Sequence, residues 1–291
     1  FDINRYQLLN IDLANPEETK NAVDLIDPDI VFHLAAESHV DRSILGPRIF
    51  LEANMIGTFN LLESLVPHWE LLASSRKESF RFIHVSTDEV FGSLDPIGLF
   101  SEDSPYKPSS PYSATKAASD HLVKSWFQTY GLPTIITNSS NNYGAWQLPE
   151  KLIPVIILNA ISKKTIPIYG DGKNIRDWIY VEDHIDALIK VALNGTIGDS
   201  YCIGGRQEKS NEEIVELICE ILDRHNKLNS PHNRFKVFVN DRPGHDRRYA
   251  IDNQKIIKEL NWSPKYDFSK AMLHTVQWYL KNIDWCKKYV N

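Results

Sequence analysis

The hydrophobic positions in the first half of the chain follow two alternating patterns. Short, nearly continuous apolar runs alternate with longer segments in which apolar residues recur at helical spacing. The runs that we expect to form strands are 6–12, 29–35, 80–87 and 132–140, and the expected helices are 16–26, 47–66 and 111–131. Apolar strands separated by helices are typical of a parallel sheet covered by helices on both faces. The sequence therefore predicts an α/β fold with a Rossmann-like parallel sheet.

The second half of the chain has a less regular pattern. Helices are expected at 150–162, 181–193, 211–222, 252–260 and 267–282, and short strands at 167–173, 200–205 and 235–239. No internal repeat, low-complexity segment or flexible linker divides this half from the first. We therefore expect a smaller C-terminal domain that interlocks with the sheet domain, with the chain crossing between the two more than once.

Composition narrows the class of protein. The 291 residues are 42% hydrophobic and 24% charged, as in an ordinary globular protein, and the net charge of −6 argues against nucleic acid as the main partner. The three cysteines, Cys202, Cys219 and Cys286, have no paired spacing, and the ten histidines have no metal-ligand spacing. No apolar run approaches the roughly 20 residues that cross a membrane, and residues 1–18 do not resemble a signal peptide. We expect a cytoplasmic protein with no metal, membrane or nucleic-acid partner.

Two carboxylates follow one of the expected buried strands. Asp88 and Glu89 come directly after the run 80–87. Adjacent like charges repel, and burying either one without a partner is costly. Taken alone, the pair has a simpler interpretation as a solvated loop at the end of a strand. Ligands of parallel sheets bind beyond the carboxyl ends of the strands, however, and this rule places residues 35–38, 87–89 and 138–142 along one edge.

A tyrosine and a lysine lie four residues apart at the start of the expected helix 111–131. Tyr112 and Lys116 would share one face of that helix, and a cation beside a phenol lowers the phenol pKa from about 10 toward neutral pH. Such a tyrosine can take a proton from a sugar hydroxyl. The same spacing occurs at 169/173 and 266/270, where glycines or a proline disfavour a continuous helix. Placement, rather than spacing, favours the first pair.

Several short segments resemble one enzyme family when they are taken in order. They read HLAAESHVDRSI, STDEVFG, PYSATKAASDHLV, SNNYG, PEKLIP, PIYGDGKNIRDWIYVEDH and DRPGHDRRY. From about residue 6 to residue 280 the chain resembles the extended short-chain dehydrogenase/reductases and, within them, the dTDP-glucose 4,6-dehydratases. The triplet Thr87, Asp88 and Glu89 is typical of this group, because related epimerases usually carry small or neutral residues in place of the two acids. The number of independent motifs makes the loop interpretation of the acidic pair a minor one.

The resemblance implies an NAD-dependent lyase. The family oxidises the sugar at C4, eliminates water across C5 and C6, and returns the hydride to C6, which converts dTDP-glucose to dTDP-4-keto-6-deoxyglucose in deoxysugar (dTDP-rhamnose) biosynthesis. Tyr112 matches the base at the 4-hydroxyl, assisted by Lys116 and Thr87. Glu89 matches the base at C5, and Asp88 matches the acid at the departing 6-hydroxyl. Neighbouring carboxyls can divide these roles because ionising one raises the pKa of the other.

Binding residues follow from the resemblance in the same way. The implied cofactor-binding residues are Asp12, Leu13, Leu34, Ala35, Ala36, Glu37, Ser38, Tyr112, Lys116 and Asn142. The implied substrate-binding residues are Ser38, Thr87, Asn141, Lys151, Leu152, Pro167, Ile168, Tyr169, Arg176, Asn211, Asp241, Arg242, Pro243, Gly244 and His245. Arg176 and Arg242 suit a diphosphate, since a guanidinium pairs with its oxygens in bidentate fashion. Residues 1–142 and 175–205 are expected to form the NAD-binding domain, and residues 143–174 and 206–291 the nucleotide-sugar domain.

The resemblance also implies an assembly. Family members form homodimers through the helices that match 47–66 and 111–128, which would meet as a four-helix bundle around a two-fold axis. Ile49, Phe50 and Phe59 are candidates for the core or the interface.

The chain departs from the family pattern at several positions. Ala53 replaces a common threonine near the cofactor, Ala145 a proline and Phe91 a tyrosine. The chain contains no glycine-rich dinucleotide turn, so we expect that about 50 to 60 residues, enough for a strand, a helix and a second strand, precede Phe1 in the native protein. Two alternatives stay open. The protein could be a 4,6-dehydratase or 4-epimerase for another nucleoside diphosphate sugar, or a non-catalytic dinucleotide-binding sensor.

Overall fold

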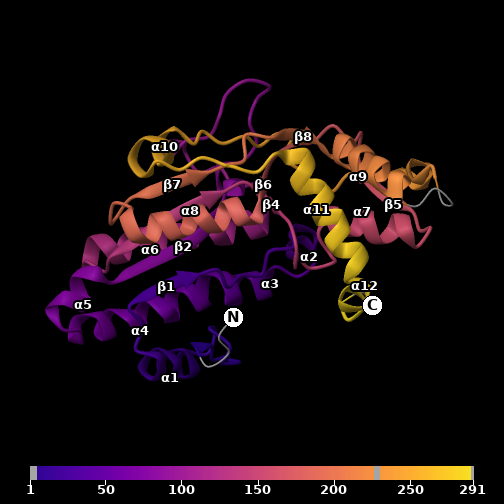
Figure 1. Ribbon diagram of the computed structural model, residues 1–291. Helices are drawn as coiled ribbons and strands as arrows, with labels where there is room; N and C mark the ends of the chain where they lie inside the picture. Colours follow the sequence, from indigo (N-terminus) through magenta and orange to yellow (C-terminus); the bar gives the residue numbers. More distant parts are fainter. Residues whose placement is uncertain (1–4, 226–229, 290–291) are drawn as a thin grey trace. The chain divides into compact units, whose positions relative to one another are not determined.

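The computed structural model describes residues 5–225 and 230–289, which form two compact units. The first unit comprises Phe1–Ser86, Ser110–Thr137 and Val191–Ser200, and the second comprises Thr87–Ser109, Asn138–Lys190 and Tyr201–Asn291. Each unit is built from three separate segments, so the chain passes between the units repeatedly. Figure 1 labels the elements of both.

A four-stranded sheet organises the first unit. Its order is β1-β2-β3-β7, with β1 at Ile30–His33, β2 at Arg81–Thr87, β3 at Thr134–Ser139 and β7 at Ser200–Ile203. The strands β1 and β2 are parallel, with Ile30 beside Arg81 and His33 beside His84. All residues of β3 are buried, as are most of β2. The predicted α/β class with a parallel sheet is confirmed.

The helices of the first unit are α1 (Pro16–Ile26), α2 (Val40–Leu45), α3 (Pro47–Phe50), α4 (Gly57–Leu71), α5 (Ser74–Ser79) and α6 (Pro111–Tyr130). The sequence defines the ends of α6 well. Ser110 forms a capping box with Ser113, Pro111 occupies the first turn, and Gly131 ends the helix with a φ of 74°. Helix α4 packs against both α1 and α6. Leu62, Leu65 and Phe82 lie in the core beneath these helices.

The predicted helix 47–66 is confirmed and extends further. It consists of α3, a π-helical segment η2 at Leu51–Ile56, and α4, which continues to Leu71. The continuous run Pro47–Leu71 is long and apolar enough to cross a membrane by length and composition, contrary to the expectation from sequence. Half of its most apolar window is buried inside the protein, as in a core helix.

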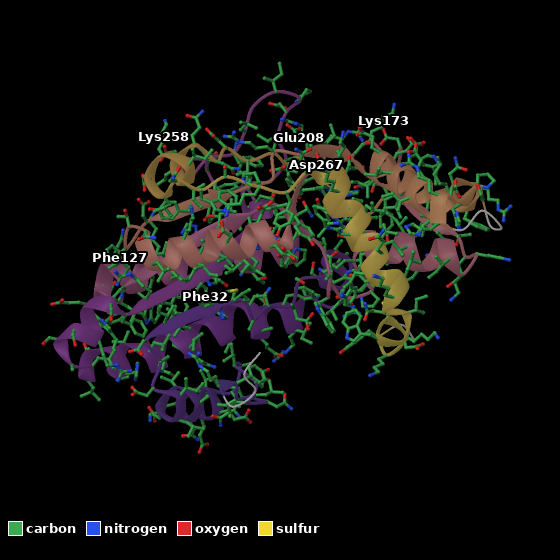
Figure 2. All side chains as sticks on the ribbon, in the orientation of Figure 1. Phe32, Phe127, Lys173, Glu208, Lys258 and Asp267 are labelled. Atoms are coloured by element: carbon green, nitrogen blue, oxygen red, sulfur yellow. The ribbon has the colours of Figure 1, made fainter. Side chains whose placement is uncertain are left out.

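Two predictions for the N-terminal strands are wrong. Residues 6–12 form neither strand nor helix, and Leu8 is 74% exposed, because these residues have no ladder pairing within the described part of the chain. The strand β1 is not buried on both faces. It lies at the edge of the sheet order, so Ile30 and Phe32 (Figure 2) are 39% and 40% exposed.

The second unit contains two small sheets. The strands β4 (Asn141–Tyr143) and β6 (Ile175–Tyr180) pair in parallel, and β8 (Glu208–Ser210) pairs antiparallel with β6. The strands β5 (Ile166–Tyr169) and β9 (Lys236–Val239) form a separate parallel pair. The sequence predicted β5 and β9 and missed the other three.

Helices complete the second unit. They are α7 (Leu152–Ile161), α8 (Val181–Asn194, which continues into the first unit), α9 (Asn211–His225), α10 (Gln254–Leu260), α11 (Phe268–Lys281) and α12 (Ile283–Lys287), with 3₁₀ turns at Asp88–Phe91 (η3) and His232–Phe235 (η5). Helices α7, α9 and α11 pack together around Ile157, Ile218 and Met272, all fully buried. Of these helices, α12 was not predicted.

Candidate active site

The acidic pair is held in a short 3₁₀ turn at the end of β2. The Oγ1 of Thr87 accepts a hydrogen bond from the Glu89 backbone N–H at 3.2 Å and donates one to Asp88 Oδ1 at 3.3 Å. The side chain of Asn138 donates to the carbonyl oxygen of Thr87 at 3.2 Å. Thr87 therefore caps the turn, and the turn fixes the backbone that carries both carboxyl groups.

The carboxyl group of Asp88 is set up to be protonated. Asp88 is 2% exposed, and its Oδ2 has no hydrogen-bond partner among the described residues. Burial, with further contributions from the charges of Glu89 and Asp177, raises the pKa of Asp88 well above its usual range, although Arg176 opposes this shift. A neutral carboxylic acid with a free oxygen can donate a proton to a leaving group.

Glu89 has a different environment from its neighbour. The side chain is half-buried, and burial raises its pKa, while Arg176, Arg242 and Lys151 favour the charged form. Asp88 has one nearby cation to favour ionisation, whereas Glu89 has three. The pKa of both carboxyls is therefore raised, and nearby cations oppose the shift at Glu89 more than at Asp88. The roles of Asp88 as acid and Glu89 as base stay a prediction.

Arg176 is the fixed cation of this group. It is 6% exposed on β6, and its guanidinium donates to the carbonyl oxygens of Ile175 at 2.8 Å and Asp246 at 2.9 Å. The guanidinium carbon lies 4.3 Å from the ring centroid of Tyr249, whose hydroxyl donates to the carboxylate of Asp246. This stacking and bonding orient the arginine before any ligand arrives. The sequence analysis missed Asp246 and Tyr249, although both lie in or beside the motif DRPGHDRRY.

A second group of predicted substrate-binding residues lies beside β5. The Nδ1 of His245 lies 2.6 Å from Asp241 Oδ1, and its ring packs edge-on against Tyr169 with centroids 6.3 Å apart. Gly170 has a φ of +59°, and an added Cβ would lie 2.9 Å from the Asp241 carboxylate. Burial and the charge of Arg242 lower the pKa of His245. The structure thus brings together predicted residues from 167–169 and 241–245.

The remaining predicted residues of the second unit lie at the ends of elements. Lys151 is the N-cap residue of α7 and Leu152 its first residue, and Asn211 begins α9. Asn141 and Asn142 lie on β4, and each has a buried side-chain Oδ1 without a hydrogen-bond partner in the described part of the chain. Asn142 is the residue expected near the nicotinamide, and an unpaired buried carbonyl oxygen fits the amide donor of that group.

Tyr112 and Lys116 lie one turn apart on α6 in the first unit. Tyr112 is 8% exposed, and its ring packs edge-on against Phe50 at 6.4 Å. Lys116 is 4% exposed, and its ammonium donates to the carbonyl oxygen of Val85 at 2.8 Å. Burial lowers the pKa of Lys116 to about 8. An ammonium whose pKa lies near neutral pH, one helical turn from a phenol, fits the predicted role of Lys116 as the cation that assists Tyr112 as a base.

A buried asparagine, which the sequence analysis missed, fixes the segment of predicted cofactor contacts at 34–38. The Oδ1 of Asn54 accepts from the Glu37 N–H at 2.8 Å, and its Nδ2 donates to the Glu37 carbonyl oxygen at 3.0 Å and to Thr115 Oγ1 at 2.9 Å. Its signal in the sequence is an isolated amide within an apolar helical pattern. Leu34, in the same segment, is 57% exposed.

A second asparagine fixes the other predicted cofactor segment. The Nδ2 of Asn60 donates to the carbonyl oxygens of Leu13 and Ala14 at 2.9 and 3.0 Å, and Asp12 Oδ1 accepts from the Ala14 N–H at 2.9 Å. Residues 12–14, which carry the predicted adenine-side contacts, are therefore ordered by α4 even though 6–12 form no strand.

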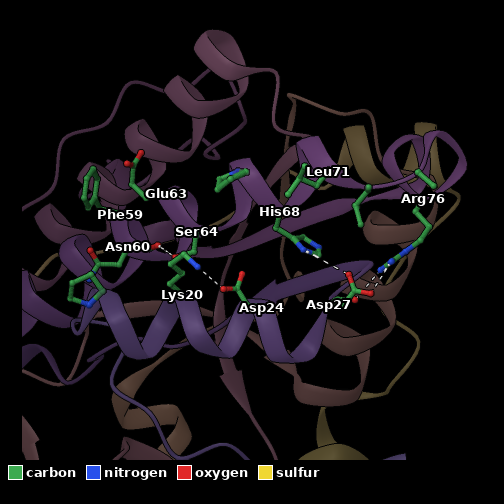
Figure 3. A pocket seen from close by; sticks show the side chains of 14 residues that line it. Lys20, Asp24, Asp27, Phe59, Asn60, Glu63, Ser64, His68, Leu71 and Arg76 are labelled. Atoms are coloured by element: carbon green, nitrogen blue, oxygen red, sulfur yellow. Dashed lines mark hydrogen bonds and ion pairs between the residues drawn. The ribbon is translucent and has the colours of Figure 1, made fainter.

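The first unit also contains a cavity of about 710 Å³ lined by residues of α1, α4 and α5 (Figure 3). None of its lining residues is a predicted site residue. Several of its charged groups pair with one another, as Lys20 does with Asp24 at 2.5 Å and Arg76 with Asp27 at 2.8 Å. We do not assign the chemistry to this cavity.

Fold and site together define the class of protein. A parallel α/β sheet, a tyrosine and lysine one turn apart on a helix, and an acidic pair at the end of a strand are the features of an extended short-chain dehydrogenase/reductase with acid–base chemistry. The family model of GDP-mannose 4,6-dehydratase matches residues 2–275, and the chain belongs to this family.

Relatives within the family are similar over nearly the whole chain. The chain is 50% identical to dTDP-glucose 4,6-dehydratase 1 of Escherichia coli (strain K12), over 98% of this chain and 81% of the relative. The crystal structure of dTDP-glucose 4,6-dehydratase from Streptomyces venezuelae, with NAD bound, has a TM-score of 0.88 and 38% identity over 98% of this chain and 83% of that chain. The Bacillus anthracis enzyme, in complex with NAD, has a TM-score of 0.84 and 40% identity over 99% and 84%. The resemblance predicted from the motifs is confirmed.

Proposed function

We propose that the protein is a hydro-lyase that converts dTDP-glucose to dTDP-4-keto-6-deoxyglucose with NAD as cofactor, a step of deoxysugar biosynthesis. The observation that carries the proposal is a pair of adjacent carboxyls in different environments. Burial raises the pKa of Asp88 well above its usual range, while at Glu89 three cations, Arg176, Arg242 and Lys151, oppose the upward shift that burial causes. An elimination of water needs one acid and one base close together. The names of the relatives supply the substrate and the cofactor.

Oxidation at C4 uses the first unit. The phenolate of Tyr112 takes the proton of the 4-hydroxyl, and Lys116 stabilises that phenolate by its charge. NAD, when bound, accepts the C4 hydride and later returns it. Lys116 gives one hydrogen bond to Val85, and its other N–H groups suit hydroxyl oxygens of the cofactor. Asn142 and the ordered segments 12–13 and 34–38 complete the proposed cofactor contacts.

Elimination uses the second unit. The 4-keto group acidifies the C5 proton, which passes to Glu89, and the C5–H electron pair forms the C5–C6 double bond as the 6-hydroxyl departs. Asp88 gives its proton to that hydroxyl, which leaves as water. The two carboxyls exchange their protonation states in this step, so the charge of the pair is conserved. Hydride return to C6 and protonation at C5 then complete the reaction.

Substrate binding depends on the cations around the acidic pair. Arg176 and Arg242 bind the diphosphate, and residues 151–152, 167–169, 211 and 241–245 surround the nucleotide and sugar. Arg176 is held by stacking and by backbone acceptors, which supports a rigid contact with the phosphate oxygens. The assignment of 1–142 and 175–205 to NAD, and of 143–174 and 206–291 to the nucleotide sugar, stays a prediction.

The proposed assembly is a homodimer through helices 47–66 and 111–128. Phe50 is fully buried and belongs to the core, but Ile49 and Phe59 are 53% and 38% exposed, as an interface requires. Light scattering at micromolar concentration is expected to give a dimer, and a monomer would remove this part of the proposal. The buried free thiols of Cys202, Cys219 and Cys286 support a reducing, cytoplasmic location.

Incubation with nucleotide sugars tests the proposed function. The protein is incubated with NAD and either dTDP-glucose, UDP-glucose or GDP-mannose, and the sugar product is identified by mass spectrometry and NMR. We expect a 4-keto-6-deoxy sugar with a preference for dTDP-glucose. Preferred conversion of another sugar would support the alternative dehydratase, and inversion at C4 would support the 4-epimerase. NAD binding without any turnover would leave a dinucleotide sensor.

A further inference from the structure

A buried acid lies one turn beyond Lys116 on α6. Asp120 follows Lys116 by one turn of α6 and is 2% exposed. The hydroxyl of Ser86 donates to Asp120 Oδ2 at 2.8 Å, and the Nε2 of His84 lies 3.2 Å from Oδ1. Ser86 and His84 both come from β2 and are also buried. Strand β2 therefore provides a polar site for a carboxylate in the interior of the first unit.

Two of the buried groups around Asp120 are charged at neutral pH and two are neutral. Burial opposes ionisation of Asp120, but its pKa lies below the usual range because His84 lies close to the carboxylate, Lys116 is positively charged and Ser86 donates a hydrogen bond. Burial and the charge of Lys116 lower the pKa of His84 to about 4, and burial and His84 hold the pKa of His33 well below its usual range. Both imidazoles are therefore neutral at pH 7, and His33 bonds to Thr58 Oγ1 at 2.9 Å. The charged groups are Lys116 and Asp120.

We propose that Asp120 is a positioning residue whose buried carboxylate holds Lys116 in the ammonium form beside Tyr112, while the hydroxyl of Ser86 holds that carboxylate in place. This proposal rests on the proposed function, because it assigns Asp120 a part in the oxidation at C4. An ammonium that is 4% exposed is costly unless a negative charge lies within reach. The fold provides this charge from the same helix, one turn away.

The pH profile of Asp120→Asn tests the proposal. The amide keeps the shape and an acceptor for Ser86 but removes the charge, so Lys116 loses its proton at lower pH. We expect the apparent pKa at which kcat/KM falls on the alkaline side of the profile to decrease by about one pH unit or more. A lower rate with an unmoved limb would indicate a structural role only and would overturn the proposal. Asp24→Asn is the matched control, because Lys20 and Asp24 have the same spacing on α1 but are exposed. It is expected to leave the limb in place.

Unfolding measurements test the coupling without turnover. Urea unfolding at pH 7 is measured for wild type, Asp120→Asn, Lys116→Met and the double variant. We expect Asp120→Asn to lower the unfolding midpoint clearly less in the Lys116→Met background than in the wild type. Equal effects in both backgrounds would overturn the proposal, whether or not the protein dehydrates dTDP-glucose. A failed sugar assay together with a coupled cycle would instead remove the proposed function alone.

Lys116→Met gives a second measurement if Asp120→Asn does not fold. Removing the cation raises the folded-state pKa of Asp120, and stability that depends on its ionisation is lost as pH falls through that pKa. Acid unfolding of Lys116→Met is therefore expected to begin at higher pH than in the wild type. An unchanged onset would contradict the coupling.

Discussion

The ammonium nitrogen of Lys116 lies 2.8 Å from the carbonyl oxygen of Val85, so the C-terminal end of β2 holds the cation of α6. Three residues further along the same strand and turn comes Asp88. One segment of ten residues, IHVSTDEVFG, thus supplies the acceptor for Lys116, the partners of Asp120 and both carboxyls of the acidic pair. Substitutions in this segment and on α6 should therefore separate the steps of the proposed reaction.

Asp88→Asn should stop the reaction after oxidation. The amide cannot protonate the departing hydroxyl, but oxidation at C4 does not need this acid. We expect product formation to fall roughly 10²–10⁴-fold, while NADH absorbance rises on mixing with substrate. Tyr112→Phe is the comparison, because it removes the base at the 4-hydroxyl and should abolish the rise itself. If both variants fail before NAD is reduced, the division of roles is wrong.

The alkaline side of the pH–rate profile should reflect the deprotonation of Lys116. Burial lowers its pKa to about 8, below its ordinary value, so the side chain is an ammonium below that pH and neutral above it. The phenolate of Tyr112 loses its neighbouring cation as the pH rises. We therefore expect kcat/KM for the oxidation step to fall above about pH 8. A rate that stays constant or rises to pH 10 would contradict the assigned role of Lys116.

Arg176→Lys should weaken substrate binding. Lysine keeps the charge but loses the bidentate fork and the stacking on Tyr249. We expect KM for the nucleotide sugar to rise roughly tenfold. Arg247→Lys is the matched control, since Arg247 is half exposed and pairs with Asp171 at 2.7 Å. An equal effect of both substitutions would mean that a general loss of positive charge, rather than the oriented guanidinium, is responsible.

Asn54→Ala should destabilise the first unit. The side chain makes three hydrogen bonds from a position that is 1% exposed, and its loss leaves the Glu37 backbone groups without their partner. We expect the free energy of unfolding in urea to fall by about 2–4 kcal/mol. Asn15→Ala removes an exposed cap of α1 and should cost only about 1 kcal/mol. A loss from Asn54→Ala no larger than that of the cap would contradict its role in fixing the segment 34–38.

The sequence predicted elements well where both ends carry local signals. Helix α1 begins and ends as expected because Asn15 and Pro16 start it, and α6 because Ser110, Pro111 and Gly131 define it. The three-residue strands β4 and β8 were missed, since so short a run has no detectable period. The strand expected at 6–12 was wrong because an apolar run forms a strand only when a neighbour pairs with it.

Only the part of the site that lies in local sequence motifs was predictable. Asp88, Glu89, Tyr112 and Lys116 could be named because they lie within short contiguous motifs, STDEVFG and PYSATKAASDHLV, that resemble those of a known family. The supporting contacts depend on distant partners. Asn54 meets Thr115 sixty-one residues away, and Arg176 meets Asp246 seventy residues away. No local pattern encodes such a pair, so these roles became visible only in three dimensions.

The fate of the C4 hydrogen tests the central claim most directly. dTDP-glucose that carries deuterium at C4 is converted to product, and the label is located by NMR. If one bound cofactor oxidises C4 and then reduces C6 after Asp88 and Glu89 have removed water, the deuterium must appear in the C6 methyl group. Deuterium returned to C4 would indicate an epimerase, and a product whose methyl group lacks the label would contradict hydride return from C4 to C6.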